Sequence, residues 1–188
     1  MLASSSVHRR ALLDRLLLPY SVRVPGVDEQ LLPGESPDNY VRRLAHAKAA
    51  AVADADERAV IIGSDQAAVL NERVLGKPGS HEEAARQLLD ASGREVLFQT
   101  GLCVLDTRDG HVSIDVIPFK VRFRDLDPPT VERYLEREPA YDAAGSFHAE
   151  GLGITLFRAM EGEDPTALVG LPLICLSHRL RERGFILP

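Results

Sequence analysis

Residues 59–70 read AVIIGSDQAAVL, a stretch that opens on a continuous aliphatic run. Such a run is typical of a strand buried on both faces of a sheet. We expect the strand to break at residues 63–66, which would leave the carboxylate of Asp65 at a strand end. Ligands of α/β proteins bind at such ends. The stretch therefore predicts an α/β fold and marks Asp65 as a candidate for chemistry.

Helices and strands are predicted to alternate irregularly around this strand, on a mixed, twisted sheet. Residues 95–106 and 111–124 are expected to pair as a hairpin around the turn at 107–110. Ser36-Pro37 is a typical helix start, and Ser80 with Glu83 forms a capping box for another. The remaining expectations are short strands at 1–3 and 20–24, helices at 7–18, 36–54, 80–91, 127–137 and 171–183, and a glycine-rich loop at 145–153.

The composition is that of an ordinary globular chain, with 45% apolar and 27% charged residues. Its 188 residues suit one domain, which we expect to cover positions 1–188. The sequence contains no apolar run near the ~20 residues that span a bilayer, and no pattern of a secretory signal. These features predict a cytoplasmic protein without membrane contact.

Charge and cysteine content exclude several other classes of protein. A net charge of −6 and 5% aromatic residues argue against a surface that grips nucleic acid. Cys103 and Cys175 lie in apolar stretches and are expected to be buried, reduced thiols. The six histidines are scattered, so a structural zinc site is not expected.

A serine-rich turn at Ser4–Ser6 precedes a predicted helix that carries Arg9 and Arg10. Small residues and a helix N-terminus allow an anion to approach backbone N–H groups, and arginine binds phosphate with two parallel hydrogen bonds. Taken alone, the feature is explained more simply by a serine N-cap and two solvated arginines. Both interpretations remain open at this point.

Other charged side chains could complete a site for a triphosphate. Asp65 could hold a cation or accept a proton, or it could merely cap a turn; Glu29 could equally belong to a surface loop. Lys48 lies on a partly apolar helix face, where a lysine usually extends to solvent. With Lys77, these groups supply the cations and carboxylates that a triphosphate and Mg²⁺ require. The chain lacks the P-loop motif.

Eight short segments match the motifs of one known family, in the same order along nearly the whole chain. They are LASSSVHRR (2–10), VDE (27–29), AHAKA (45–49), IGSDQ (62–66), GKP (76–78), TG (100–101), AGSFHAEGLG (144–153) and GLP (170–172). One such motif is weakly specific, whereas eight in register are highly specific. The chain thus resembles the Maf family of nucleotide pyrophosphatases.

Further details resemble one branch of that family, the 7-methyl-GTP pyrophosphatases. These are Gln66 after Asp65, an extra residue before Arg9, and the segments 119–124, 145–147 with 150–151, 153–157, 164–165 and 168–172. The resemblance implies hydrolysis of 7-methyl-GTP to 7-methyl-GMP and pyrophosphate, which excludes modified nucleotides from nucleic acids. The alternative within the family is a dTTP/UTP pyrophosphatase, against which Gln66 and Glu150 speak.

The resemblance also implies roles for individual residues. Asp65 would be the catalytic acid–base residue and would hold a divalent cation, Mg²⁺ or Mn²⁺, together with Glu29. The substrate would be bound through its phosphates by Ser4, Arg9, Lys48 and Lys77, and through its base by His8, Gln66 and Glu150. The implied fold is an elongated mixed sheet with flanking helices and two lobes around a central cleft, usually in a homodimer.

Two positions depart from the family pattern. Val7 replaces a typical proline, which changes the turn but removes no chemical group. His8 replaces a larger aromatic residue, and stacking of a cationic methylated guanine on an aromatic face contributes ~0.5–2 kcal/mol. We expect Glu150 to compensate by accepting hydrogen bonds from guanine and neutralising its charge.

Two functions of other classes fit the sequence less well. A nucleotide-binding regulator of cell division without important turnover is argued against by the intact Asp65, Lys48 and Lys77. An RNA-binding module is disfavoured by the net charge of −6 and the absence of a stacking motif.

Overall fold

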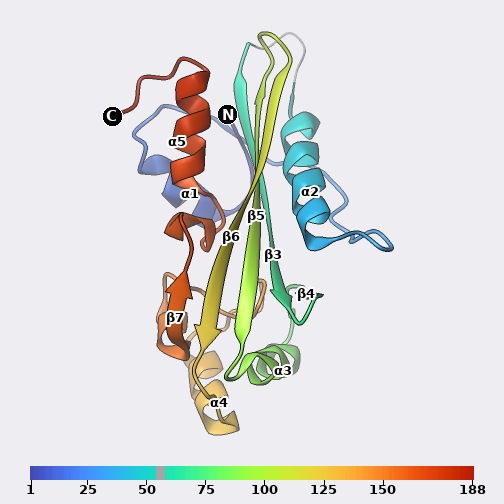
Figure 1. Ribbon diagram of the computed structural model, residues 1–188, viewed down its shortest axis with the longest axis vertical. Coiled ribbons are helices and arrows are strands. Elements are labelled where there is room, and N and C mark those ends of the chain that lie inside the picture. The colour runs from blue at the N-terminus through green and yellow to red at the C-terminus, as the bar shows by residue number, and fades with distance from the viewer. Residues whose placement is uncertain (54–57) are drawn as a thin grey trace. The chain divides into compact units, whose positions relative to one another are not determined.

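The computed structural model describes residues 1–53 and 58–188 as an α/β protein with a mixed sheet (Figure 1). The strands pair in the order β2-β1-β3-β5-β6-β7, and β4 pairs with β3. β1 is parallel to β2 and β3, whereas β4 and β7 are antiparallel to β3 and β6. The strands are β1 (Leu2–Ala3), β2 (Val22–Arg23), β3 (Val60–Leu70), β4 (Arg73–Leu75), β5 (Glu95–Asp106), β6 (His111–Phe123) and β7 (Phe157–Glu161). The predicted fold class is confirmed.

The helices predicted at 36–54 and 80–91 begin at their predicted serine caps. Ser36 and Ser80 accept hydrogen bonds from the backbone N–H groups of Asn39 and Glu83. The helices are α1 (Val7–Asp14), α2 (Pro37–Ala51), α3 (His81–Ala91), α4 (Pro128–Arg137) and α5 (Leu173–Glu182), with 3₁₀ turns η1 (Leu152–Leu156) and η2 (Pro165–Ala167). In the described part of the chain, none of them is both long enough and apolar enough to cross a membrane.

Several predicted ends of elements shift in the structure. α1 stops at Asp14 rather than near residue 18, where Leu17 adopts a positive φ of 54° and is exposed. α2 ends at Ala51, and Asp54, the predicted end, lies outside the described residues. The β5–β6 hairpin and its turn are confirmed.

The expected break in the strand at residues 63–66 was wrong. β3 runs without interruption from Val60 to Leu70, so Asp65 lies in the middle of a strand rather than at its end. The apolar sequence resumes at Ala67, and residues 68–70 pair with β4. Ser64 is buried, but its Oγ lies 2.8 Å and 3.0 Å from two carbonyl oxygens, which offsets the cost of burial.

The chain divides into two compact units. Unit 1 contains Met1–Gln66, Thr100–Ile117 and Asp164–Pro188, and unit 2 contains Ala67–Gln99 and Pro118–Glu163. The strands β3, β5 and β6 therefore contribute residues to both units. The expectation of a single domain stays a prediction.

The sheet of unit 1 buries both of its faces under helices (Figure 1). Ile62 and Leu102 pack with leucines of α1 and α5, whereas the preceding and following residues, Ile61 and Cys103, pack with alanines of α2. Because side chains alternate between the faces of a strand, the continuous aliphatic run serves two cores at once. Cys103 is confirmed as a buried free thiol; Cys175 is also free but only partly buried.

α2 lies unusually close to the strands of unit 1. A Cβ atom at Gly63 would lie 2.2 Å from the carbonyl oxygen of Ala45, and one at Gly101 would lie 2.3 Å from that of Val41. Both positions therefore require the absence of a side chain. The helix backbone rests directly on β3 and β5, which brings its inward side chains to the polar segment of β3.

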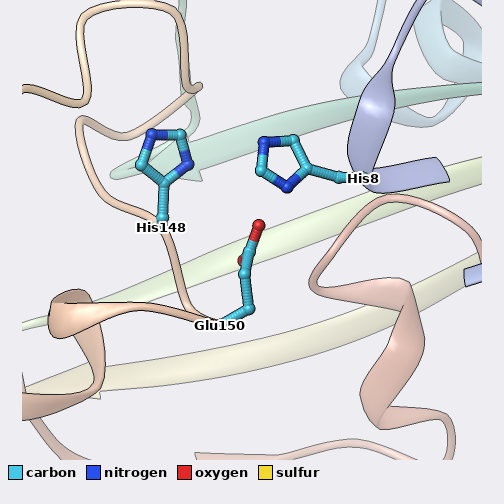
Figure 2. A group of neighbouring side chains, drawn as sticks. All are labelled: His8, His148 and Glu150. Carbon is cyan, nitrogen blue, oxygen red and sulfur yellow. The ribbon is translucent and has the colours of Figure 1, made fainter. Parts of the chain in front are cut away.

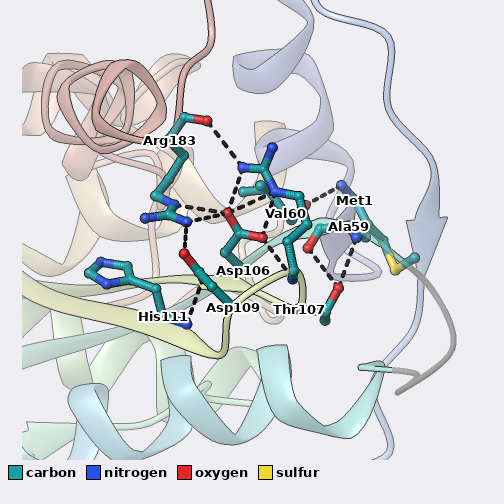
Figure 3. Close-up of polar contacts among 9 residues, drawn as sticks. Met1, Ala59, Val60, Asp106, Thr107, Asp109, His111 and Arg183 are labelled. Atoms are coloured by element: carbon teal, nitrogen blue, oxygen red, sulfur yellow. Dashed lines mark hydrogen bonds and ion pairs between the residues drawn. The ribbon is translucent and has the colours of Figure 1, made fainter.

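A buried carboxylate ties the β5–β6 turn to the C-terminal segment (Figure 3). Asp106 is fully buried and accepts hydrogen bonds from the guanidinium groups of Arg108 and Arg183. The Arg108 hydrogen bond is the main reason why the pKa of Asp106 lies well below its usual value. Arg183 also pairs with Asp109, and Thr107 bonds the backbone of Ala59. These contacts join three distant stretches of unit 1.

Unit 2 is built around a cluster of phenylalanine rings. Phe147 contacts Phe98, Phe123 and Phe157 edge-to-face, with ring centres 4.8–5.6 Å apart. This geometry is favoured by aromatic quadrupoles and anchors the glycine-rich loop to β5, β6 and β7. The loop thus packs through Phe147, while Glu150, three residues later, stays exposed.

We predict that Gly101→Ala lowers the free energy of unfolding by about 3 kcal/mol, because the new Cβ would meet a backbone carbonyl that cannot rotate away. Urea unfolding followed by circular dichroism measures the change. Gly26→Ala is the matched control, because nothing lies within 4 Å of a Cβ there. Equal stability losses in both variants would show that the approach of α2 is not the constraint.

Candidate active site

Three charged side chains of unit 1 converge at the middle of β3. The Lys48 Nζ atom of α2 lies 2.6 Å from Asp65 Oδ1 and 2.6 Å from Glu29 Oε1. Lys48 and Asp65 are buried, whereas the Glu29 side chain is half exposed. Lys48 therefore does not extend to solvent, and Asp65 does not merely cap a turn.

The close approach of α2 explains why a lysine can be buried here. Lys48 follows Ala45 by three residues and shares its inward face, so its ammonium group reaches the carboxylate two residues after Gly63. Burying a lone ammonium ion is costly, but a paired one is tolerated when its hydrogen bonds are satisfied. The partners of Lys48 are thus what allows this residue in the core.

The serine-rich turn sits beside this group in the sheet. Ala3 pairs with Gly63, so Ser4 leaves β1 next to the polar segment of β3. Ser4 is buried, and its Oγ accepts a hydrogen bond from the backbone N–H of Ser6. Ser6 in turn caps α1 by accepting from the N–H of Arg9, so the predicted N-cap is confirmed.

Arg9 has the features of an anion-binding side chain. Its Nε donates to the carbonyl oxygen of Gly170 at 2.8 Å, and no other side-chain hydrogen bond of Arg9 is found among residues 1–53 and 58–188. Burial lowers the pKa of Arg9, while the nearby charges of Asp65 and Glu29 act in the opposite direction. Its terminal nitrogens are thus held close to the carboxylates and are available to bind an anion.

Tyr40 borders the site, although no motif of the sequence singles it out. It lies on α2, two turns before Lys48. Its hydroxyl donates a hydrogen bond to the carbonyl oxygen of Glu29 at 2.9 Å. Burial, and then the charges of Asp65 and Glu29, raise the pKa of Tyr40 to about 12, so the phenol stays protonated as a donor.

Gln66 is fixed by a neighbouring turn. Its Nε2 donates to the carbonyl oxygens of Ala167 and Leu168, at 2.7 Å and 3.1 Å, and contacts Thr100 Oγ1 at 3.0 Å. These bonds use the donors of the side-chain amide and leave Oε1 as an acceptor. The predicted role of Gln66 in base choice stays a prediction.

Two of the predicted site residues belong to unit 2. Lys77 is exposed after β4, and Glu150 is exposed in the glycine-rich loop. The Glu150 carboxylate and the ring of His148 project from this loop, with ligand atoms within 4.8 Å of each other (Figure 2). His8, also drawn in Figure 2, comes from α1 of unit 1. The roles of Lys77, His8 and Glu150 stay predictions.

The loop that carries Glu150 is held by Glu138, at the end of α4. The Glu138 carboxylate accepts hydrogen bonds from the N–H groups of Leu152 and Gly153, at 2.9 Å and 3.1 Å. A Cβ at Gly151 would lie 2.1 Å from Glu138 Oε1, so the loop backbone lies directly on this carboxylate. Glycine at position 151 therefore permits a tight contact.

Comparison with known proteins identifies the family. The model of the family described as Maf-like protein matches residues 1–183, so this chain belongs to the Maf family. The predicted resemblance is thereby confirmed. A protein of Pseudomonas fluorescens named 7-methyl-GTP pyrophosphatase is 52% identical over 188 residues, covering 100% of this chain and 98% of the relative. Proteins of that name from Alkalilimnicola ehrlichii and Nitrosococcus oceani are 52% and 49% identical over 185 residues, covering 98% of this chain and 93% of each relative.

We predict that Lys48→Met lowers the free energy of unfolding by about 3–5 kcal/mol, because it leaves the buried Asp65 carboxylate without its cation. The double variant Lys48→Met/Asp65→Asn should lose less than the sum of the single variants, with a coupling of about 1–3 kcal/mol. Urea unfolding of all four proteins completes the cycle. Lys77→Met is the exposed control, and strictly additive losses would contradict the buried pair.

Proposed function

We propose that this protein hydrolyses 7-methyl-GTP to 7-methyl-GMP and pyrophosphate. The observation that carries the proposal is the group of Lys48, Asp65 and Glu29, in which Lys48 and Asp65 are buried, present in a chain that aligns over its full length with relatives of that name. Removal of a modified nucleotide from the pool would keep it out of nucleic acids. We further propose that the protein acts in the cytoplasm, as a homodimer of single-domain chains.

The reaction is attack of water on the α-phosphorus. The water oxygen forms a bond to phosphorus, the bond from phosphorus to the α,β-bridging oxygen breaks, and pyrophosphate leaves with that electron pair. Asp65 accepts the proton of the attacking water. Its Oδ1 is held by Lys48, and in the described residues its Oδ2 accepts no hydrogen bond, which leaves that oxygen for the water.

A divalent cation fits the carboxylates of this site. Asp65 and Glu29 both reach the same ammonium nitrogen, so two hard oxygen donors lie close enough to hold one Mg²⁺ or Mn²⁺. The cation would neutralise phosphate charge and lower the pKa of a bound water. Lys48 would then direct its charge to the phosphates.

The remaining cations of the site would bind the triphosphate. Arg9 offers its terminal nitrogens beside Asp65, and Ser4 offers its hydroxyl proton, because its oxygen already accepts from Ser6. Lys77 would add a further charge. Such groups stabilise negative charge on the departing pyrophosphate.

Base choice is assigned to His8, Gln66 and Glu150. The acceptor Oε1 of Gln66 and the carboxylate of Glu150 can take hydrogen bonds from the N–H groups of guanine, whereas uracil and thymine offer one such donor. Glu150 also neutralises the positive charge of 7-methylguanine. His8 would supply a smaller stacking surface than a larger aromatic.

The test of the proposal is pyrophosphate release by the purified protein with Mg²⁺ or Mn²⁺, across 7-methyl-GTP, GTP, UTP, dTTP and CTP. We expect the highest kcat/KM on 7-methyl-GTP. Preference for UTP or dTTP would keep the reaction but overturn the assignment of Gln66 and Glu150. Folded protein that releases no pyrophosphate from any of them would overturn the enzyme assignment.

We predict that Asp65→Asn lowers kcat by about 10²–10⁴-fold, because the amide cannot accept the proton of the water. Single-turnover assays on 7-methyl-GTP measure the loss, with circular dichroism to establish folding. Asp38→Asn is the matched control, since Asp38 lies on α2 and pairs with Arg42. Nearly full turnover by folded Asp65→Asn would remove Asp65 from its role.

We predict that Glu150→Ala lowers kcat/KM for 7-methyl-GTP by about 10–100-fold, as expected for lost hydrogen bonds to a charged group, and affects UTP much less. Parallel assays on both nucleotides give the ratio. Glu163→Ala removes another exposed carboxylate of unit 2 and should leave the ratio unchanged. Equal losses on both substrates would make Glu150 structural.

A further inference from the structure

We propose that Tyr40 and Arg43 of α2 are positioning residues that hold the Glu29 loop, residues 24–36, so that the Glu29 carboxylate meets the divalent cation. The inference rests on the proposed function, because the cation site is part of it. Neither residue is proposed to touch substrate. Both act through backbone carbonyl groups, Tyr40 on that of Glu29 and Arg43 on that of Gln30.

The Glu29 loop needs support from outside itself. Residues 24–36 contain no helix or strand, and most of them are exposed. Ordering the backbone of one residue costs about 1–2 kcal/mol, so a free loop of this length would sample many conformations. A cation ligand in such a loop binds well only if other contacts fix its position.

Tyr40 supplies the first contact. Its hydroxyl donates to the carbonyl oxygen of Glu29 itself, at 2.9 Å. This bond fixes the peptide that follows the Cα atom from which the carboxylate projects. The Tyr40 ring also lies under the guanidinium of Arg43, whose Cζ is 5.7 Å from the ring centre, so the two anchoring side chains support each other.

Arg43 supplies the second contact and joins the two limbs of the loop. Its Nη2 donates to the carbonyl oxygen of Gln30 at 2.9 Å. Its Nε and Nη2 also donate to the Glu35 carboxylate, at 2.6 Å and 2.7 Å. Glu35 in turn accepts from the backbone N–H of Leu32. Arg43 thus fixes the carbonyl group of Gln30, the residue after Glu29. Through Glu35 it also holds the C-terminal end of the loop.

The consequence is a defined place for the carboxylate. With the carbonyls of residues 29 and 30 both held by α2, the Glu29 side chain reaches Lys48 Nζ at 2.6 Å. Lys48 lies on the same helix, α2. The Glu29 loop and the Lys48 ammonium group are therefore both held in place by one helix. Partners that orient metal ligands typically change metal affinity by 10–100-fold when they are removed.

The test is a titration with Mn²⁺ alone, read by the loss of the free-ion signal in electron paramagnetic resonance. We expect Arg43→Met to raise the Kd for Mn²⁺ by about 10–100-fold. Tyr40→Phe, which loses one hydrogen bond, should raise it a few-fold to about tenfold. At saturating Mn²⁺ both variants should keep most of the wild-type kcat. A raised Kd for Mn²⁺ with a nearly unchanged kcat would not result from a general loss of structure.

Arg42→Met is the matched control. Arg42 lies next to Arg43 on α2 but bonds Asp38 and the carbonyl oxygen of Ile114 rather than the Glu29 loop. Its Kd for Mn²⁺ should equal that of the wild type. If Arg43→Met fails to fold, Tyr40→Phe removes a single oxygen and carries the test alone.

The variants Glu29→Gln and Asp65→Asn separate the two proposals. If they bind Mn²⁺ as tightly as the wild type, the cation site is misplaced and the positioning role falls with it, whereas the proposed reaction is decided separately by pyrophosphate release. If they weaken binding while Arg43→Met and Tyr40→Phe bind normally, only the positioning role is overturned. Weaker binding in all four, with Arg42→Met unchanged, is the expected result.

Discussion

The contact of the α2 backbone with β3 and β5 is the constraint on which unit 1 depends. Two glycines, Gly63 and Gly101, permit it, because any side chain there would overlap a helix carbonyl. Because α2 lies so close to the strands, its inward-facing Lys48 reaches the Asp65 carboxylate of β3 with no layer of apolar side chains between them. A helix packed at the usual distance on larger residues would leave Lys48 short of Asp65.

Local sequence signals were enough to predict most elements and several site residues. The serine caps of α2 and α3 and the β5–β6 hairpin depend on neighbours a few residues away, and all were found. The continuity of β3 was missed because it depends on remote partners. Ser64 is satisfied by the carbonyls of Gly101 and Gly170, 37 and 106 positions away. No pattern within residues 59–70 reveals those acceptors, and the loop contacts of Tyr40 and Arg43 were hidden for the same reason.

The site also shows how backbone carbonyls organise charged side chains. The carbonyl oxygen of Gly170 accepts a hydrogen bond from Arg9 Nε and lies 3.0 Å from the Ser64 hydroxyl oxygen. One carbonyl group therefore orients the Arg9 guanidinium and also provides a hydrogen-bond acceptor for a buried hydroxyl of β3. In unit 2 the roles are reversed, since the Glu138 carboxylate accepts from backbone N–H groups of the loop that carries Glu150. In both units, the side chains assigned to the substrate depend on partly buried hydrogen bonds to or from the backbone.

The interleaved composition of the two units has a consequence for synthesis of the chain. Residues 67–99 and 118–163 of unit 2 are all synthesised before residues 164–188 of unit 1. Until then Asp106 has no Arg183, and Arg9 and Ser64 have no Gly170 carbonyl. Unit 1, with Lys48, Asp65 and Glu29, is therefore completed last during translation. A chain interrupted before residue 164 would contain Lys48, Asp65 and Glu29 but lack the Gly170 carbonyl that orients Arg9 and the Arg183 side chain that pairs with Asp106.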